Sequence, residues 1–274
     1  MRELLRVQPG FRLSDVDPAS TPGFDGGKSA GKRALAEGAA EFTELQEKLF
    51  AESRFGGDRS VLLVLQAMDT AGKGGILDHV IGQLSPQGVK TFSFKAPTEE
   101  EKQHDFLWRV RRQLPSAGYL GVFDRSHYED VLIHRVRGSS TPEVIDERYG
   151  LIEEFERRLV DSGTTVVKVM LHVSLDEQKR RLEARLDDPS KHWKFNPSDL
   201  DERSLWEAYM SAYEIALGRT STEVAPWYVV PADKKWYARL AVQGLLVEAL
   251  RGLRLEWPAG EFDVAAAKER LAGS

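Results

Sequence analysis

Cysteine is absent from all 274 residues, which excludes disulfide bonds, thiol catalysis and a cysteine-ligated zinc site. No apolar run approaches the roughly 18 residues of a membrane span, and the N-terminus has no signal-peptide apolar region. Positive charge is not in excess either, since the net charge is −5. This charge argues against a general nucleic-acid binder. We therefore expect a cytoplasmic protein without membrane or nucleic-acid partners, in which an anionic ligand must meet a local basic cluster.

Apolar runs alternate with helical patterns along the chain. Strands are expected over residues 60–66, 89–94, 119–124, 164–173 and 227–230. Helices are expected over residues 29–56, 72–84, 98–114, 141–163, 175–187, 201–217 and 236–253. Such alternation is typical of a three-layer α/β fold, with a five-stranded parallel sheet covered on both faces. We expect a single domain, in which residues 1–55 form an N-terminal arm and helix packed on a core of residues 56–274.

The most informative segment, residues 61–75, reads VLLVLQAMDTAGKGG, an apolar strand that runs into a small-residue loop and a helix. That order is typical of a loop that binds phosphate through backbone N–H groups and a lysine, here Lys73. The loop departs from the usual Walker A pattern. Ala67 replaces the first glycine, Gly74 replaces the Ser or Thr that ligates Mg²⁺, and a carboxylate, Asp69, lies inside the loop. These residues predict a phosphate site with altered metal chemistry; the alternative is a surface turn with a solvated lysine.

A second carboxylate follows the third expected strand. Asp124 ends an apolar run 51 positions after Lys73 (124 minus 73), which is the place of a Walker B aspartate. Asp69 and Asp124 are therefore candidate ligands of one or two Mg²⁺ ions, which prefer oxygen ligands and bridge to phosphates. The alternative for Asp69 is a loop cap, and for Asp124 a cap of the next helix. Arg125, beside Asp124, is suited to contact a phosphoryl group.

Further basic residues cluster in two places. Residues 175–200 resemble a lid over a phosphate site, because cations flank the Asp188-Pro189 break; they are Arg180, Arg181, Arg185, Lys191 and Lys194. The alternative is a solvated helix in which these arginines pair with nearby acidic residues. A second set could extend the anionic path, and it consists of Lys102, Arg109, Arg111 and Arg112. His127, at an expected helix start, is interpreted as packing or capping in preference to catalysis.

With these motifs in view, the sequence resembles the family-2 polyphosphate kinases from about residue 20 to 255. The resemblance is carried by three segments, QAMDTAGKGG at 66–75, DRSHYED at 124–130, and the lid RRLEAR at 180–185 with DPSKHWK at 188–194. It implies a P-loop kinase fold similar to thymidylate kinase, with a helical lid. The second segment, with glutamate at position 129 (Glu129), resembles the corresponding segment of class III members. These members phosphorylate both AMP and ADP from polyphosphate.

The resemblance also implies residue roles. Asp69, Lys73, Asp124, Arg125 and Arg185 would be catalytic, with Asp69 and Asp124 holding Mg²⁺, for which Mn²⁺ can substitute. The phosphate chain would be bound by Ala71, Gly72, Lys73, Gly74, Gly75, Arg181, Lys191 and Lys194. Glu129 and Arg125 would lie at the acceptor nucleotide. A homo-oligomer, dimer or tetramer, is implied as well.

The resulting function is transfer of a terminal phosphoryl group from inorganic polyphosphate to AMP or ADP, giving ADP or ATP. Two alternatives remain: an ATP-dependent nucleotide kinase on the same fold, and a non-catalytic module that binds nucleotide or polyphosphate.

Overall fold

Five parallel strands form one sheet at the centre of the protein, whose computed structural model describes residues 1–274. The strands are β1 (Ser60–Gln66), β2 (Val89–Ser93), β3 (Leu120–Asp124), β4 (Thr164–His172) and β5 (Trp227–Pro231), in the order β2-β3-β1-β4-β5. Every residue of β1 is buried, because this central strand is covered on both faces. The predicted α/β fold with a five-stranded parallel sheet is confirmed, and each strand lies within two residues of its expected bounds.

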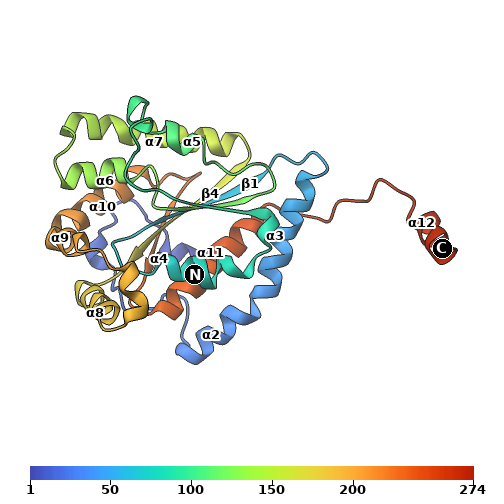
Figure 1. Ribbon diagram of the computed structural model, residues 1–274, viewed down its shortest axis with the longest axis horizontal. Helices are drawn as coiled ribbons and strands as arrows, with labels where there is room; N and C mark the ends of the chain where they lie inside the picture. Colours follow the sequence, from blue (N-terminus) through green and yellow to red (C-terminus); the bar gives the residue numbers. More distant parts are fainter.

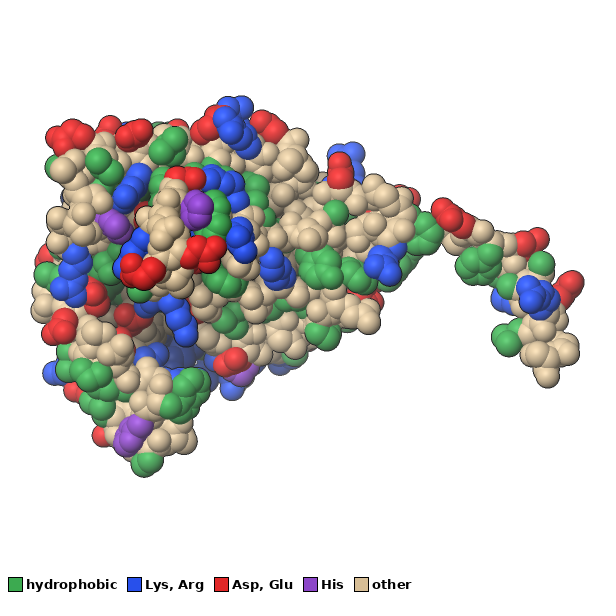
Figure 2. All heavy atoms as spheres, turned by 45° about the horizontal axis from the view of Figure 1, so that its top comes forward, with side chains coloured by type: hydrophobic (Ala, Val, Ile, Leu, Met, Phe, Trp, Pro, Cys, Tyr) green, Lys and Arg blue, Asp and Glu red, His purple; other side chains and the backbone are tan.

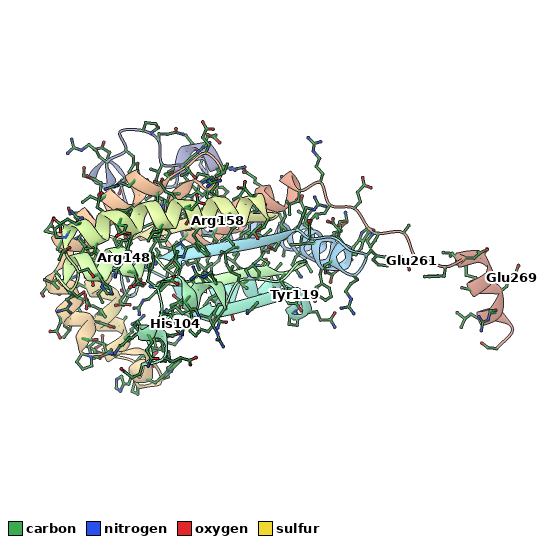
Figure 3. The ribbon with its side chains drawn as sticks, turned by 90° about the horizontal axis from the view of Figure 1, so that it is seen from above. His104, Tyr119, Arg148, Arg158, Glu261 and Glu269 are labelled. Atoms are coloured by element: carbon green, nitrogen blue, oxygen red, sulfur yellow. The ribbon has the colours of Figure 1, made fainter.

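Helices cover both faces of the sheet (Figure 1). One layer contains α6 (Glu129–Val136), α7 (Pro142–Asp161) and α10 (Trp206–Thr220), which contact one another. The other contains α2 (Lys28–Glu37), α3 (Ala39–Ser53), α4 (Lys73–His79) and α11 (Lys235–Gly252), with α11 contacting the other three. In the view from above, α7 lies alongside the sheet, roughly in the direction of its strands, and carries Arg148 and Arg158 (Figure 3).

The N-terminal segment packs along β5 at one edge of the sheet. After α1 (Arg2–Leu5), Arg6 forms an antiparallel bridge with Tyr228, and the Val7 amide donates to the Trp227 carbonyl at 2.9 Å. Residues of this segment and of α3 belong to the same hydrophobic core as the strands. At the other end of the chain, α12 (Val264–Ala272) is exposed and stands apart from the body, with Glu261 and Glu269 on this arm (Figure 3).

The expected helix over residues 98–114 is wrong. The structure has only a 3-10 turn, η4 (Glu101–Gln103), and one helical turn, α5 (Trp108–Arg111). The capping pattern at the start of this segment is present in the structure, because Thr98 and Glu101 cap each other reciprocally. The helix does not continue, because the Asp105 side chain accepts from the Leu107 amide at 3.0 Å and starts a new turn.

Three other expected helices are shorter or divided. The helix expected over residues 29–56 is two helices that meet at Gly38, and Gly27 takes the cap position expected for Ser29. The segment 201–217 is also two helices, α9 (Ser198–Ser204) and α10, which meet at Leu205. Helix α4 ends at His79 and is followed by short 3-10 turns, η2 (Ile81–Gln83) and η3 (Pro86–Gly88).

The expected lid corresponds to α8 (Leu175–Leu186), followed by the 3-10 helix η5 (Pro189–Lys194) and α9. Ser174 caps α8, since its hydroxyl accepts from the Glu177 amide at 3.1 Å. No helix combines the length and the apolar character needed to cross a membrane.

Candidate active site

Strand pairing brings the two predicted carboxylates to the same edge of the sheet. Leu65, near the end of β1, pairs with Asp124 at the end of β3, so the loop after β1 and the turn after β3 lie side by side. The Arg125 amide then donates to the Leu65 carbonyl at 3.0 Å. This is the carboxyl edge where open α/β folds collect their ligands, and it also lies between strands that lead to opposite sides of the sheet.

A cleft of about 800 Å³ opens at this edge. It is lined by the loop residues 69–76, by β-strand ends and by side chains of α8, η5 and α11. Figure 2 shows a hollow on this side of the molecule in which Lys and Arg side chains gather. Ten lining residues are basic, namely Lys73, Lys95, Arg125, Arg180, Arg181, Arg185, Lys191, Lys194, Lys235 and Arg239. The protein as a whole is acidic, so this cleft is the local basic cluster that an anionic ligand requires.

The loop itself has a backbone that ordinary residues rarely adopt. Thr70 has φ 65° and Gly72 has φ 125°, values in the left-handed region. Such conformations cluster at functional sites, where the surrounding structure holds them. Lys73 begins α4, and its ammonium donates to the Ala67 carbonyl at 3.1 Å, which brings the charge back over the loop.

Arg125 is paired with a carboxylate of the loop. Its Nη2 donates to Asp69 Oδ1 at 2.7 Å, which joins β3 to the loop after β1. Burial alone would lower the pKa of Arg125, but the carboxylates of Glu129, Asp69 and Asp124 outweigh it and hold that pKa above its usual value. The guanidinium is therefore charged at every working pH, as a phosphoryl-binding group must be.

Asp124 has an oxygen atom that the protein leaves without a partner. Its Oδ2 accepts from the Ser93 hydroxyl at 3.4 Å, whereas its buried Oδ1 has no hydrogen-bond donor. Thr70 Oγ1 is buried and unpartnered as well. Buried polar atoms without partners are rare in proteins, and here they line a cleft. A divalent cation fits Asp124 Oδ1, and since no group of three acidic or histidine ligands exists, water and substrate phosphates would complete its coordination.

Arg181 lies in the cleft wall but is fully engaged by the protein. Its Nε donates to Glu177, its Nη1 to the carbonyls of Thr70 and Ala71, and its Nη2 to the carbonyls of Ala232 and Asp233. A guanidinium has five N–H donors, and five acceptors surround this one. Arg181 thus has no donor left for phosphate, and its contacts support a positioning role in place of the expected phosphate contact.

The other lid cations line the cleft and remain available to a ligand. Arg185 donates to the Lys194 carbonyl at 3.2 Å and lies 3.6 Å from Asp199 Oδ2. The Lys194 ammonium lies over the ring of Trp193, which is 79% exposed. Lys191 pairs with Asp188 at 2.6 Å in an exposed setting, where a polyanion can displace the carboxylate.

Glu129, expected at the acceptor nucleotide, lies outside the wall of the cleft. It lies behind Arg125, with the end of the Gln66 side chain 3.0 Å from its Oε1. Burial raises the pKa of the Glu129 carboxyl, although Arg125 and Lys73 oppose this. A contact with an acceptor nucleotide stays a prediction for this residue.

The second basic set predicted from the sequence does not reach the cleft. Arg109 donates to Glu101 and to the Lys95 carbonyl, Arg111 pairs with Asp105, and none of them lines the cleft. This interpretation is wrong because the long helix that would have presented these side chains is not formed.

The sequence analysis missed several charged residues that line the cleft. Lys235 and Arg239 lie four positions apart on α11, a spacing that places both on one face of a helix and was a usable signal. Lys95 follows the end of β2 and was a weaker one. Nothing in the sequence marks Asp199, since only the folding of α9 brings it near Asp69 and Arg185.

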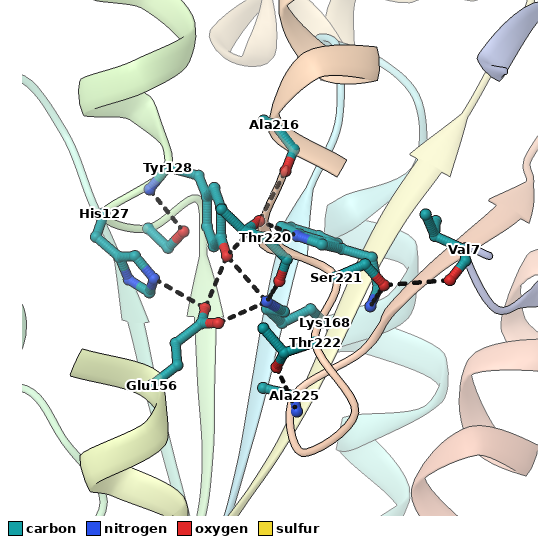
Figure 4. Close-up of polar contacts among 12 residues, drawn as sticks. Val7, His127, Tyr128, Glu156, Lys168, Ala216, Thr220, Ser221, Thr222 and Ala225 are labelled. Carbon is teal, nitrogen blue, oxygen red and sulfur yellow. Dashed lines mark hydrogen bonds and ion pairs between the residues drawn. The ribbon is translucent and has the colours of Figure 1, made fainter. Parts of the chain in front are cut away.

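His127 lies in a buried polar network behind the site (Figure 4). Its side chain is 1% exposed, and its Nε2 lies 3.3 Å from Glu156 Oε1. The Tyr128 hydroxyl donates to Glu156 at 2.8 Å, and the Lys168 ammonium donates to Tyr128 at 3.0 Å and to the Thr220 carbonyl at 2.7 Å. The interpretation of His127 as a packing residue is therefore confirmed.

Comparison with known proteins adds to this geometry. The model of the polyphosphate kinase 2 family matches residues 26–256. The chain belongs to this family. It is 50% identical to an AMP/ADP-polyphosphate phosphotransferase of Meiothermus ruber over 93% of this chain and 95% of that one. It is 44% identical to an ADP-polyphosphate phosphotransferase of Rhodopseudomonas palustris, over 84% of this chain and 81% of that one.

A solved structure of a family member has the same fold as this chain. The crystal structure of polyphosphate kinase 2 from Arthrobacter aurescens TC1 is 61% identical in sequence and superposes with a TM-score of 0.98. The match covers 99% of this chain and 96% of that chain. The resemblance drawn from the three sequence segments is thus confirmed at the level of the family and the fold.

Proposed function

We propose that this polyphosphate kinase 2 transfers the terminal phosphoryl group of inorganic polyphosphate to AMP and to ADP, giving ADP and ATP. The observation that carries the proposal is the cleft, which is lined by Lys73, Arg125, two carboxylates and a wall of further basic side chains. The names of the Meiothermus ruber and Rhodopseudomonas palustris relatives support the same donor and acceptors.

The chemistry is mainly positioning and neutralisation of charge. An oxygen of the acceptor's terminal phosphate attacks the end phosphorus of the polyphosphate chain, and the anhydride bond to the next phosphate breaks. The shortened chain leaves with the electron pair of that bond. No strong general base is required, because the acceptor phosphate is already an anionic nucleophile. Lys73, Arg125 and Arg185 would hold the phosphate oxygens, and the loop at Gly72, Gly74 and Gly75 would add backbone N–H groups.

Asp69 and Asp124 would hold Mg²⁺, for which Mn²⁺ can substitute. When bound, the cation would neutralise the charge that develops on the phosphate oxygens during transfer. Asp124 Oδ1, which has no donor in the protein, is the atom we assign to it. Asp69 already accepts from Arg125, so it would hold the cation through its remaining oxygen lone pairs.

An assay without ATP tests the proposal. Purified protein, polyphosphate and Mg²⁺ are mixed with AMP in one reaction and with ADP in another, and the nucleotides are separated by chromatography. We expect ADP and ATP from AMP, and ATP from ADP, with no product after EDTA is added. Product that requires ATP as donor would favour an ordinary nucleotide kinase. Binding without product from any donor would favour a non-catalytic module.

Two further properties stay proposals. We infer from the family resemblance that the chain assembles into dimers or tetramers, which light scattering after size exclusion tests directly. We also infer that it works in the cytoplasm, where nucleotides and polyphosphate are available.

A further inference from the structure

The carbonyl groups of the phosphate loop are held from outside by α8. Three consecutive carbonyls are involved: Gln178 Nε2 donates to that of Asp69 at 3.1 Å, and Arg181 Nη1 donates to those of Thr70 and Ala71 at 3.0 and 2.7 Å. Gln178 and Arg181 are 1% and 5% exposed, so both contacts are shielded from water. The first half of α8 is therefore fastened to the loop and does not move as a free lid.

These carbonyls determine where the amide groups of the loop point. A peptide unit is planar, with its C=O and N–H directed to opposite sides. Fixing the carbonyl of Asp69 orients the N–H of Thr70, and fixing the carbonyl of Ala71 orients the N–H of Gly72. Both of these N–H groups lack a protein acceptor, whereas the Ala71 N–H is used by the Met68 carbonyl at 3.3 Å. The two oriented amides are thus free for an anion, beside the unpaired amides of the first turn of α4.

We propose that Gln178 and Arg181 are positioning residues, which hold the peptide planes 69–70 and 71–72 so that the amides of Thr70 and Gly72 face the phosphate chain. The inference rests on the proposed function, since it concerns the loop that binds phosphate. A flipped peptide would instead turn a carbonyl oxygen toward the phosphates and repel them. The left-handed φ of Thr70 favours such a fastening, because a residue other than glycine that is released from it relaxes to other conformations.

Arg181 also ties the loop to a third segment. Its Nη2 donates to the carbonyls of Ala232 and Asp233, between β5 and α11, and the Asp233 side chain accepts from the Ser174 amide at the start of α8. One planar guanidinium thus joins the phosphate loop, α8 and the turn before α11. A lysine has a single ammonium with three donors and cannot reach these four carbonyls together.

The experiment compares tripolyphosphate binding to the full chain by isothermal titration calorimetry. The variants are Arg181→Lys, Arg181→Gln and Gln178→Met, and the control is Lys179→Gln, which removes a cation from the exposed face of the same helix. We expect Arg181→Lys and Arg181→Gln to weaken binding alike, by about tenfold or more, since several hydrogen bonds are lost. Gln178→Met should weaken binding too, although it changes no charge, and the control should bind as the wild type does.

A second readout follows the two amides directly. In ¹⁵N-labelled protein, tripolyphosphate should shift the amide proton resonances of Thr70 and Gly72 downfield, and this shift should shrink in both Arg181 variants. A purely structural role would leave the bound-state shifts unchanged. Circular dichroism reports whether each variant folds, and if the Arg181 variants do not, Gln178→Met decides the outcome.

The proposal is overturned if Arg181→Lys keeps wild-type affinity while Arg181→Gln loses it, because charge and not geometry would then matter. It is also overturned if Gln178→Met binds normally. Calorimetry needs no turnover, so a chain that binds tripolyphosphate but makes no nucleotide product would contradict only the proposed function. A wild-type chain that does not bind tripolyphosphate would contradict both.

Discussion

Lys168 of β4 and Glu156 of α7 form an ion pair of 2.5 Å in the interior, where their side chains are 0% and 2% exposed. Each charge is also hydrogen-bonded, since Tyr128 contacts both and the Thr220 carbonyl accepts from Lys168. Burial lowers the pKa of Lys168, and Glu156 opposes this. A buried pair of this kind is sensitive to the loss of one member, because the other is left charged and unpaired.

We therefore expect Lys168→Met to lower the free energy of unfolding by about 3–5 kcal/mol, measured by urea denaturation. The double variant Lys168→Met/Glu156→Leu should recover much of that loss, since no buried charge remains. Arg157→Ala serves as control, because Arg157 belongs to an exposed pair on the same helix. A double variant no more stable than the single one would show that the pair is not what holds this region together.

The Glu129 carboxyl gives a pH dependence whose sign follows from its raised pKa. Burial raises this pKa above the usual value of 4.5, so the folded state binds more protons than the unfolded state between that value and the raised one. The free energy of unfolding then falls as pH rises through this window. Glu129→Gln removes the effect, and we expect its stability relative to wild type to be higher at pH 7 than at pH 4.5 in thermal unfolding scans. An equal difference at both pH values would contradict the raised pKa.

Lys73→Ala tests the phosphate-binding lysine. Removing the ammonium leaves the loop without its own cation, and we expect transfer from polyphosphate to AMP to fall at least about a hundredfold. The side chain is only partly buried, so the melting temperature should stay close to that of the wild type. Near-normal turnover in a folded variant would remove Lys73 from the site.

Asp124→Asn tests the cation site without changing side-chain size. The substitution halves the number of strong oxygen ligands at the carboxyl end of β3, so the Mg²⁺ concentration needed for half-maximal activity should rise and maximal transfer should fall. A titration of activity against Mg²⁺ and Mn²⁺ measures both changes. If the variant has the wild-type Mg²⁺ requirement, Asp124 Oδ1 is not the metal-binding atom.

Gly72→Ala tests the left-handed turn of the loop. A Cβ at Gly72 would meet only Arg181 Nη1 at 3.9 Å, so space is available and the penalty comes from φ 125°. We expect a loss of about 1–3 kcal/mol or a relaxed loop that binds phosphate poorly. Gly150→Ala, in open space within α7, should have the opposite effect and stabilise by about 0.5–1 kcal/mol. Equal behaviour of the two variants in chemical denaturation would show that the loop is not strained.

Much of the fold was predictable because buried parallel strands leave an unmistakable apolar pattern. The run at residues 60–66 became β1 with the expected bounds, and the position of Asp124 after the third strand followed from the same pattern. Parallel pairing then placed Asp124 beside the loop after β1, which sequence distance alone would not suggest. The helices were less predictable, because Asp105 and Leu205 interrupt them through local bonds and turns that compete with the periodic signal.

The sequence could not predict the different surroundings of Arg181 and Arg185, because these depend on where each guanidinium group lies in the folded protein. Arg181 and Arg185 share one helical face, and their spacing placed both over the phosphate site. The structure separates them, because Arg181 is 5% exposed and meets five protein oxygens, whereas Arg185 lies further out toward Asp199. Only the packing of α8 against the loop distinguishes Arg181, which is buried and bonded to the protein, from Arg185, which is available to a ligand.

The bridge between Arg6 and Tyr228 bears on the behaviour of the protein at high concentration. An uncovered edge strand offers N–H and C=O groups with which another chain can pair, and this is a common route to aggregation. Residues 6 and 7 cover part of that edge of β5 from within the same chain. The sheet is thereby protected on this side against pairing with other molecules, at a position remote from the phosphate loop.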